Sequence, residues 1–162
     1  MKSLLAAIAW LLPAAVVQTT LVPRHWPLDL FLLLAALNAL RRSPRRAAAE
    51  GMLVGLVQDF AGGGLLGLNA SSKALAAGLV AWPQRRFSGY LVVIGTVLVF
   101  AASWVERGVK LLLLASLGTA PASWTGPWLW MPTWHAVAAI LLLTFGVWAA
   151  GRRRQSSTLL MR

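Results

Sequence analysis

Long apolar runs alternate with short basic, glycine-rich or proline-rich segments along the 162 residues. A helix needs roughly 20 apolar residues to cross about 30 Å of hydrocarbon, and its backbone must be hydrogen-bonded internally. The pattern therefore predicts an all-α membrane protein, a six-transmembrane-helix bundle that forms a single integral membrane domain over residues 1–162. The expected spans are about 3–22, 28–40, 47–61, 69–82, 88–105 with an extension to 117, and 132–150.

Composition supports a membrane protein and excludes several other classes. Hydrophobic residues make up 59% of the chain and charged residues only 12%, whereas a water-soluble domain carries about a quarter charged residues. The net charge of +11 comes from short clusters between apolar runs, which is typical of cytoplasmic loops and not of a nucleic-acid-binding face. With no Cys and two well-separated His residues, we expect no metal site.

The clusters of Lys and Arg also predict an orientation. Placing both termini in the cytoplasm puts nearly all of the loop arginines on that side of a multi-pass membrane protein. Several tryptophans then fall near the outer interface, where amphipathic rings are favoured. The expected interface anchors are Trp26, Trp104, Trp128, Trp130 and Trp134.

The chain has four carboxylates, and each one inside a span is a functional candidate because burying a charge in a bilayer is costly. Asp29 lies at the start of the second span, where we expect it to cap the helix. Glu50 follows Arg46 by one turn and is expected to pair with it. We expect Glu106 and Lys110 to pair in the same way on a solvated helix extension.

Asp59 stands just before a glycine run that separates the third and fourth spans. We expect its carboxylate to accept from N–H groups of the loop 62–68 and to pair with Lys73, which would form a polar clamp across the hairpin. A ligand or proton site is the functional alternative. The expected hairpin residues are Asp59, Gly62, Gly67, Asn69 as an N-cap, and Lys73.

Small residues recur at four-residue spacing on the two helices of this hairpin. Such spacing lets helix backbones approach closely within a membrane. Internal packing is the favoured interpretation, and a face for another protein's membrane helix is the alternative. The candidate partner-helix faces are Gly51 and Gly55 on the first helix and Ala70, Ala74 and Gly78 on the second.

The sequence offers no recognisable constellation for catalysis or cofactor binding. We find no nucleophile–base pair, phosphate-binding glycine loop or metal-spaced His/Glu set, and we expect no acid–base pair at one membrane depth. No catalytic, cofactor-binding or metal-binding residue is therefore assigned.

The segment from Pro27 through Ala81 resembles the rod shape-determining protein MreD family. The resemblance rests on a proline-led apolar helix that ends in a basic turn, followed by GMLVGLVQDFAGGGLLGLNASSKALAAGLV. The family's aspartate, its glycines and the start of its next helix correspond to Asp59, Gly62, Gly67, Leu68 and Ala70.

This resemblance implies a non-enzymatic subunit of the machinery for lateral cell-wall elongation. The implied partners are an MreC-like bitopic protein and, directly or indirectly, a RodA-like glycosyltransferase, a class B penicillin-binding protein and the MreB filament. In the scaffold hypothesis that follows, membrane lipid is a further expected partner, because the cytoplasmic arginines would meet anionic lipid or an acidic partner surface. The implied fold is similar to the substrate-binding subunits of energy-coupling-factor transporters.

Two other function classes stay open. A small-solute binding subunit of a vitamin transporter would use the irregular outer hairpin and the tryptophan-rich loop to cover a pocket. An intramembrane enzyme would need an acid–base pair that the sequence does not place.

Overall fold

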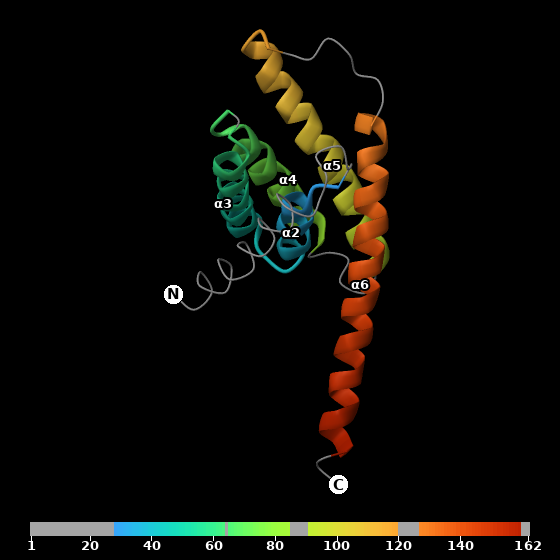
Figure 1. The fold of residues 1–162 in the computed structure, drawn as a ribbon. Helices are drawn as coiled ribbons and strands as arrows, with labels where there is room; N and C mark the ends of the chain where they lie inside the picture. Colours follow the sequence, from blue (N-terminus) through green and yellow to red (C-terminus); the bar gives the residue numbers. More distant parts are fainter. Residues whose placement is uncertain (1–27, 64, 85–90, 120–126, 160–162) are drawn as a thin grey trace.

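The computed structural model describes residues 28–63, 65–84, 91–119 and 127–159, and across these ranges the chain forms helices and no strand (Figure 1). The expected first span, at residues 3–22, and Trp26 lie outside the described residues. The helices are α2 (Leu30–Ala39), α3 (Pro44–Gly62), α4 (Leu68–Gln84), α5 (Leu91–Ser116) and α6 (Pro127–Leu159).

Helix α2 is short and forms the centre of the structure. Its sequence LFLLLAALNA is apolar except for Asn38, so the helix is suited to enclosure by its neighbours. Figure 1 shows α2 between the α3–α4 pair and helices α5 and α6. A tight turn ends it, in which the Arg41 N–H donates to the Asn38 carbonyl at 3.1 Å and the Arg42 N–H donates to the Ala39 carbonyl at 3.0 Å.

Helices α3 and α4 form an antiparallel hairpin whose backbones approach closely at glycine. A Cβ at Gly51 would lie 2.5 Å from the Lys73 carbonyl oxygen, and one at Gly55 would overlap the backbone of Asn69 and Ala70. The predicted internal packing of these small residues is therefore confirmed. Gly51, Gly55 and Ala70 are buried within the chain, so the alternative that they form a face for a partner helix is wrong.

The other two small residues of this set lie further along α4. Gly78 is next to Ala48 of α3, because a Cβ there would lie 3.5 Å from the Ala48 Cβ. Ala74 is half-buried. Gly78 thus also packs against α3 within the hairpin.

Two of the described helices are long and apolar enough to cross a membrane. These are Leu91–Ser116 and Trp130–Ala149, judged by length and composition. Helix α5 is one continuous helix that ends at Ser116, one residue before the predicted end of the extension at 117. Helix α6 includes Pro132 and continues beyond the predicted end at 150, past the ends of the other helices (Figure 1).

Candidate functional site: an internal charged group beside a capped hairpin

Asp59 closes the α3–α4 hairpin by accepting from the amides that begin α4. Helix α3 ends at Gly62, and Gly63 and Gly67 adopt positive φ angles of 62° and 94°, which glycine tolerates. The Asp59 Oδ2 accepts from the N–H groups of Gly67 at 2.9 Å and Ala70 at 3.2 Å. Its Oδ1 accepts from the Asn69 backbone N–H at 3.1 Å and the Asn69 Nδ2 at 2.8 Å.

This arrangement confirms part of the predicted hairpin and corrects the rest. The carboxylate does accept from the loop, at Gly67. Asn69, however, is the second residue of α4 and not its N-cap, and it donates to Asp59. Four donors and the positive end of the α4 dipole compensate the charge of Asp59, which is 1% exposed.

The predicted Asp59–Lys73 pair is wrong. The Lys73 ammonium donates to Asp29 Oδ2 at 2.8 Å and to Glu106 Oε1 at 2.5 Å, so this side chain is directed towards α2 and α5 and not towards the hairpin loop. Lys73 has no exposed surface. Two carboxylates from other elements already compensate the charge of the buried ammonium, and Asp59 is compensated by amide donors.

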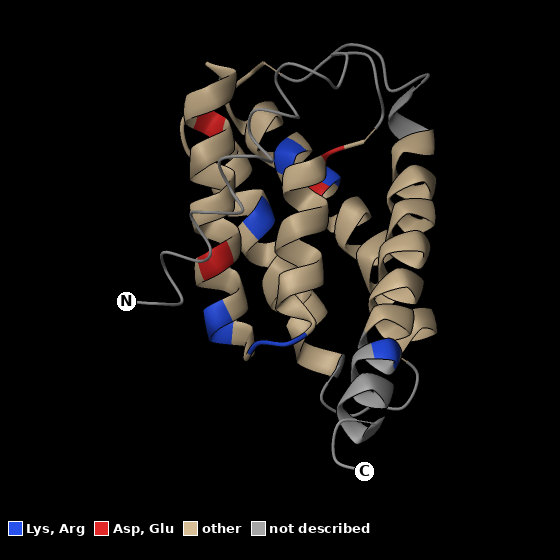
Figure 2. Ribbon diagram, turned by 60° about the horizontal axis from the view of Figure 1, so that its bottom comes forward, with Lys and Arg blue, Asp and Glu red and all other residues tan. Residues whose placement is uncertain are grey.

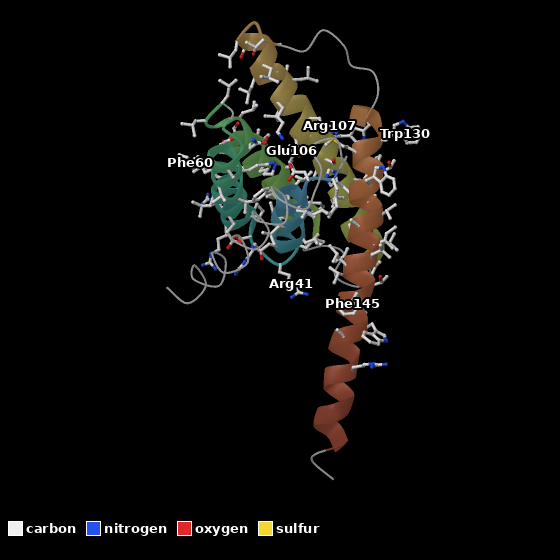
Figure 3. The ribbon with its side chains drawn as sticks, viewed as in Figure 1. Arg41, Phe60, Glu106, Arg107, Trp130 and Phe145 are labelled. Atoms are coloured by element: carbon white, nitrogen blue, oxygen red, sulfur yellow. The ribbon has the colours of Figure 1, made fainter. Side chains whose placement is uncertain are left out.

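Lys73 is the centre of what we call the internal charged group, formed by Asp29, Lys73, Glu106 and Lys110. Lys110 donates to Glu106 Oε1 at 2.8 Å, so this oxygen accepts from two ammonium groups. Two carboxylates and two ammonium groups balance each other in formal charge. Figure 2 marks the charged positions along the ribbons of the different helices, and Figure 3 shows Glu106 inside the bundle.

The predicted pair of Glu106 with Lys110 is confirmed, but its predicted setting is wrong. Glu106 is 4% exposed and lies in the bundle interior instead of on a solvated extension. The reason is helical phase, because Ser103, Glu106 and Leu111 are all buried on one side of the continuous α5.

Asp29 joins this group to three other helices. Its Oδ1 accepts from the Leu32 N–H at 3.1 Å, which confirms the predicted cap of α2. Its Oδ2 also accepts from the Gln58 Nε2 of α3 at 3.2 Å. Its backbone N–H donates to the His135 Nε2 of α6 at 2.8 Å. One residue at the start of α2 therefore contacts α3, α4 and α6.

Ser103 and His135 resemble a nucleophile and its general base. The hydrogen bonds, however, favour the wrong His135 tautomer for that role. The Ser103 Oγ lies 2.8 Å from His135 Nδ1. Because Nε2 accepts from the Asp29 N–H, neutral His135 carries its proton on Nδ1 and donates it to Ser103. A general base would need the opposite arrangement, with an unprotonated nitrogen facing the hydroxyl.

Further polar contacts join α5 to α6 and α2 to α3. Arg107 of α5 is buried and its Nη2 contacts the Met131 sulfur of α6. Glu50 binds Arg42 at 3.3 Å and accepts from the Asn38 Nδ2 at 2.5 Å. The predicted pair of Glu50 with Arg46 is therefore wrong, because Arg42 and Asn38 bind the Glu50 carboxylate.

The structure describes the side chains of three of the five predicted interface anchors. Trp104, Trp130 and Trp134 are exposed, and Figure 3 shows Trp130 on the outer side of α6. The side chain of Trp128, like Trp26, lies outside the described part of the chain.

The internal charged group overturns one expectation from the sequence. Ionisable residues from separate helices do meet at one place, whereas we expected no acid–base pair at a common depth. Sequence reasoning missed His135, Ser103 and Arg107 as members of this polar region. The available signal was Lys73 itself, because a lysine in an apolar helix requires an acidic partner.

In the described ranges, no group of three or more His, Cys, Asp or Glu side chains is placed to hold a metal ion. No protein-family model, curated protein or solved structure matches the chain.

Proposed function

We propose that the protein is a non-enzymatic membrane scaffold subunit of the bacterial cell-wall elongation complex. In this proposal the chain forms six spans in the inner membrane, with both termini cytoplasmic, and binds an MreC-like bitopic protein. It supports a RodA-like glycosyltransferase, a class B penicillin-binding protein and the MreB filament directly or through that partner. The motif from Pro27 through Ala81 is the sequence basis of the proposal.

The observation that carries the proposal is the mutual pairing of the buried charges. Lys73 binds Asp29 and Glu106, and Lys110 binds Glu106, so these groups bind one another. The four hydrogen bonds to Asp59 likewise have a structural role. Such contacts fix helices relative to one another, which suits a rigid subunit that holds partners.

Exposed apolar side chains are the surface left for lipid and partner helices. The close-packed glycines of α3 are covered by α4, so a partner must use other positions. Helix α6 carries a long exposed apolar surface (Figure 3). Its large exposed side chains are Trp130, Trp134, Val137, Ile140, Leu141, Leu142, Phe145, Val147 and Trp148.

Copurification from the native membrane tests the scaffold. The tagged full chain, expressed at its natural level, should recover an MreC-like single-span protein in quantitative mass spectrometry, and its depletion should convert rods to spheres. A tagged, unrelated six-span protein at the same level is the control. Recovery of the same proteins by both baits, together with normal rods after depletion, would overturn the proposal.

A small-solute binding subunit is the second candidate, and one observation favours it. The side-chain amide oxygen of Gln58, Oε1, is buried beside the internal charged group and has no hydrogen-bond partner among the described residues. A polar solute or a water molecule would satisfy it. Native mass spectrometry after mild purification tests this candidate, which requires a bound vitamin-sized compound that is lost in Gln58→Leu.

A further inference from the structure

The turn between α2 and α3 presents an unbalanced group of arginines. Arg41, Arg42, Arg45 and Arg46 occur within six consecutive residues. Arg42 is held by Glu50 at 3.3 Å, and Glu50 is itself held by Asn38. The other three arginines are exposed, and among the described residues no carboxylate forms a salt bridge with them.

Because Glu50 binds Arg42, that arginine has a structural role. The other three arginines are free to bind a ligand outside the chain. The Arg42–Glu50–Asn38 contacts connect the turn to α2 and α3. Arg41, Arg45 and Arg46 contribute about three uncompensated positive charges to one end of the bundle. Figure 3 shows Arg41 at the end of α2, pointing away from the helices.

The surface next to these arginines is apolar and aromatic. Because Gly78 of α4 is adjacent to Ala48 of α3, the last turn of α4 lies beside the first turns of α3. Trp82, one turn after Gly78, is 72% exposed, and Met52 of α3 is also exposed. Exposed tryptophan and arginine together are typical of the boundary between hydrocarbon and headgroups.

Helix α6 repeats this combination independently. The Arg152 guanidinium lies 4.0 Å from the centre of the Trp148 ring, and both side chains are exposed. The C-terminal half of α6 extends in the direction in which the α2–α3 turn faces (Figures 1 and 2). Two separate elements thus present arginine and tryptophan on the same side of the structure.

We infer that Arg41, Arg45 and Arg46 form a binding surface for the phosphate of acidic phospholipids, and that Arg42 does not contribute to it. Each guanidinium provides paired donors that fit a phosphodiester, and the adjacent apolar surface accommodates acyl chains. An acidic protein surface would match the charge but not the exposed Trp82 and Met52. The inference rests on the membrane placement in the proposed function, but not on any protein partner.

Native mass spectrometry of the full chain tests this surface. The detergent-solubilised protein is given equal amounts of phosphatidylglycerol and phosphatidylcholine with identical acyl chains. The wild type should retain phosphatidylglycerol preferentially. The triple variant Arg41→Gln, Arg45→Gln, Arg46→Gln should lose at least about tenfold of that preference, since each basic residue near an anionic surface contributes about fivefold.

Two control variants separate charge from position. The triple lysine variant at the same positions should keep most of the preference, and Arg152→Gln should change it less than the triple glutamine variant does. If the triple glutamine variant does not accumulate, Arg45→Gln and Arg46→Gln are measured singly and each should lower the preference. An unchanged preference in the glutamine variants would overturn the inference.

Inorganic phosphate distinguishes a lipid surface from a simple anion site. Phosphate alone, added at millimolar concentration, should leave the bound phosphatidylglycerol in place, and its displacement would overturn the assignment to lipid. Because these measurements use the isolated chain, they can fail while an MreC-like partner is still recovered from cells. Failure to recover that partner likewise leaves the lipid preference measurable.

Discussion

Asp59 and Asp29 are both buried carboxylates that accept from amides at the start of a helix, but their charges are compensated in different ways. Asp59 accepts from amide donors of its own hairpin, all within eleven residues of it in sequence. Asp29 also caps a helix, through Leu32, but adds an ammonium group from Lys73, 44 residues away. One carboxylate closes a local loop, and the other holds distant helices together.

The difference shows what each type of contact does for the fold. Backbone N–H groups at a helix start can compensate a carboxylate without any cation, because they are fixed dipoles at the positive end of the helix. Between helices no such dipoles are available for Glu106, so an ammonium must be buried with it. Removing one member of such a group leaves an uncompensated charge in a dry site.

Replacing Lys73 should give the largest effect. Lys73→Met leaves Asp29 and Glu106 without their shared cation, and removing one partner of a buried ion pair costs about 3–5 kcal/mol. We expect the free energy of unfolding in mixed micelles, measured by denaturant titration with circular dichroism, to fall by about that amount.

Two further variants sharpen this result. Lys110→Met should cost much less, because Lys73 still compensates Glu106 and the Lys110 side chain is partly exposed. Adding Asp29→Asn to Lys73→Met should recover part of the loss by removing the carboxylate that is left without a cation, since Lys110 still binds Glu106. Equal losses for Lys73→Met and Lys110→Met would contradict the central position of Lys73.

Asp59→Asn should have an intermediate effect. The amide keeps one acceptor oxygen but places an NH₂ group where the carboxylate accepts from Gly67 or Asn69, and hydrogen bonds to a charged group contribute about 1.5–3 kcal/mol. The same titration measures the loss. In the Asp59→Asn, Lys73→Met double variant the two losses should add within about 0.5 kcal/mol, as expected of residues without shared partners. Strong non-additivity would support the rejected clamp.

Ser103→Ala should have the smallest effect. It removes one hydrogen bond to His135 and leaves the Nδ1 proton without this acceptor, at a cost of about 1 kcal/mol. Exchange of the Asp29 amide hydrogen, followed by mass spectrometry, should stay slow because Nε2 still accepts from it. Rapid exchange of that amide in Ser103→Ala would contradict the tautomer assigned to His135.

The sequence predicted most features that depend on near neighbours, although the Arg46–Glu50 pair was wrong. Helix boundaries at the glycine run, the cap at Asp29, the Glu106–Lys110 pair and the amide contact of Asp59 all join residues within one or two turns or across a short loop. The close approach at Gly55 was also predictable, because small residues at four-residue spacing have few other uses in apolar helices.

The partners of Lys73 could not be predicted, because they depend on how helices are arranged. Asp59 is nearer to Lys73 in sequence than Asp29 or Glu106 is, so proximity along the chain favoured the wrong acid. The pairing depends on which side of α4 faces α2 and α5, and no local sequence pattern indicates that side. His135 was missed for the same reason, since its partner Asp29 is 106 residues away.

Solid-state NMR of the reconstituted full chain tests the pairing of Lys73 most directly. Dipolar recoupling between ¹⁵N at lysine Nζ and ¹³C at carboxyl carbons reports which acids contact an ammonium, and the chain has only four carboxylates. A lysine–aspartate contact should be present, should persist in Asp59→Asn and should vanish in Asp29→Asn. A contact that persists in Asp29→Asn and vanishes in Asp59→Asn would contradict the internal charged group.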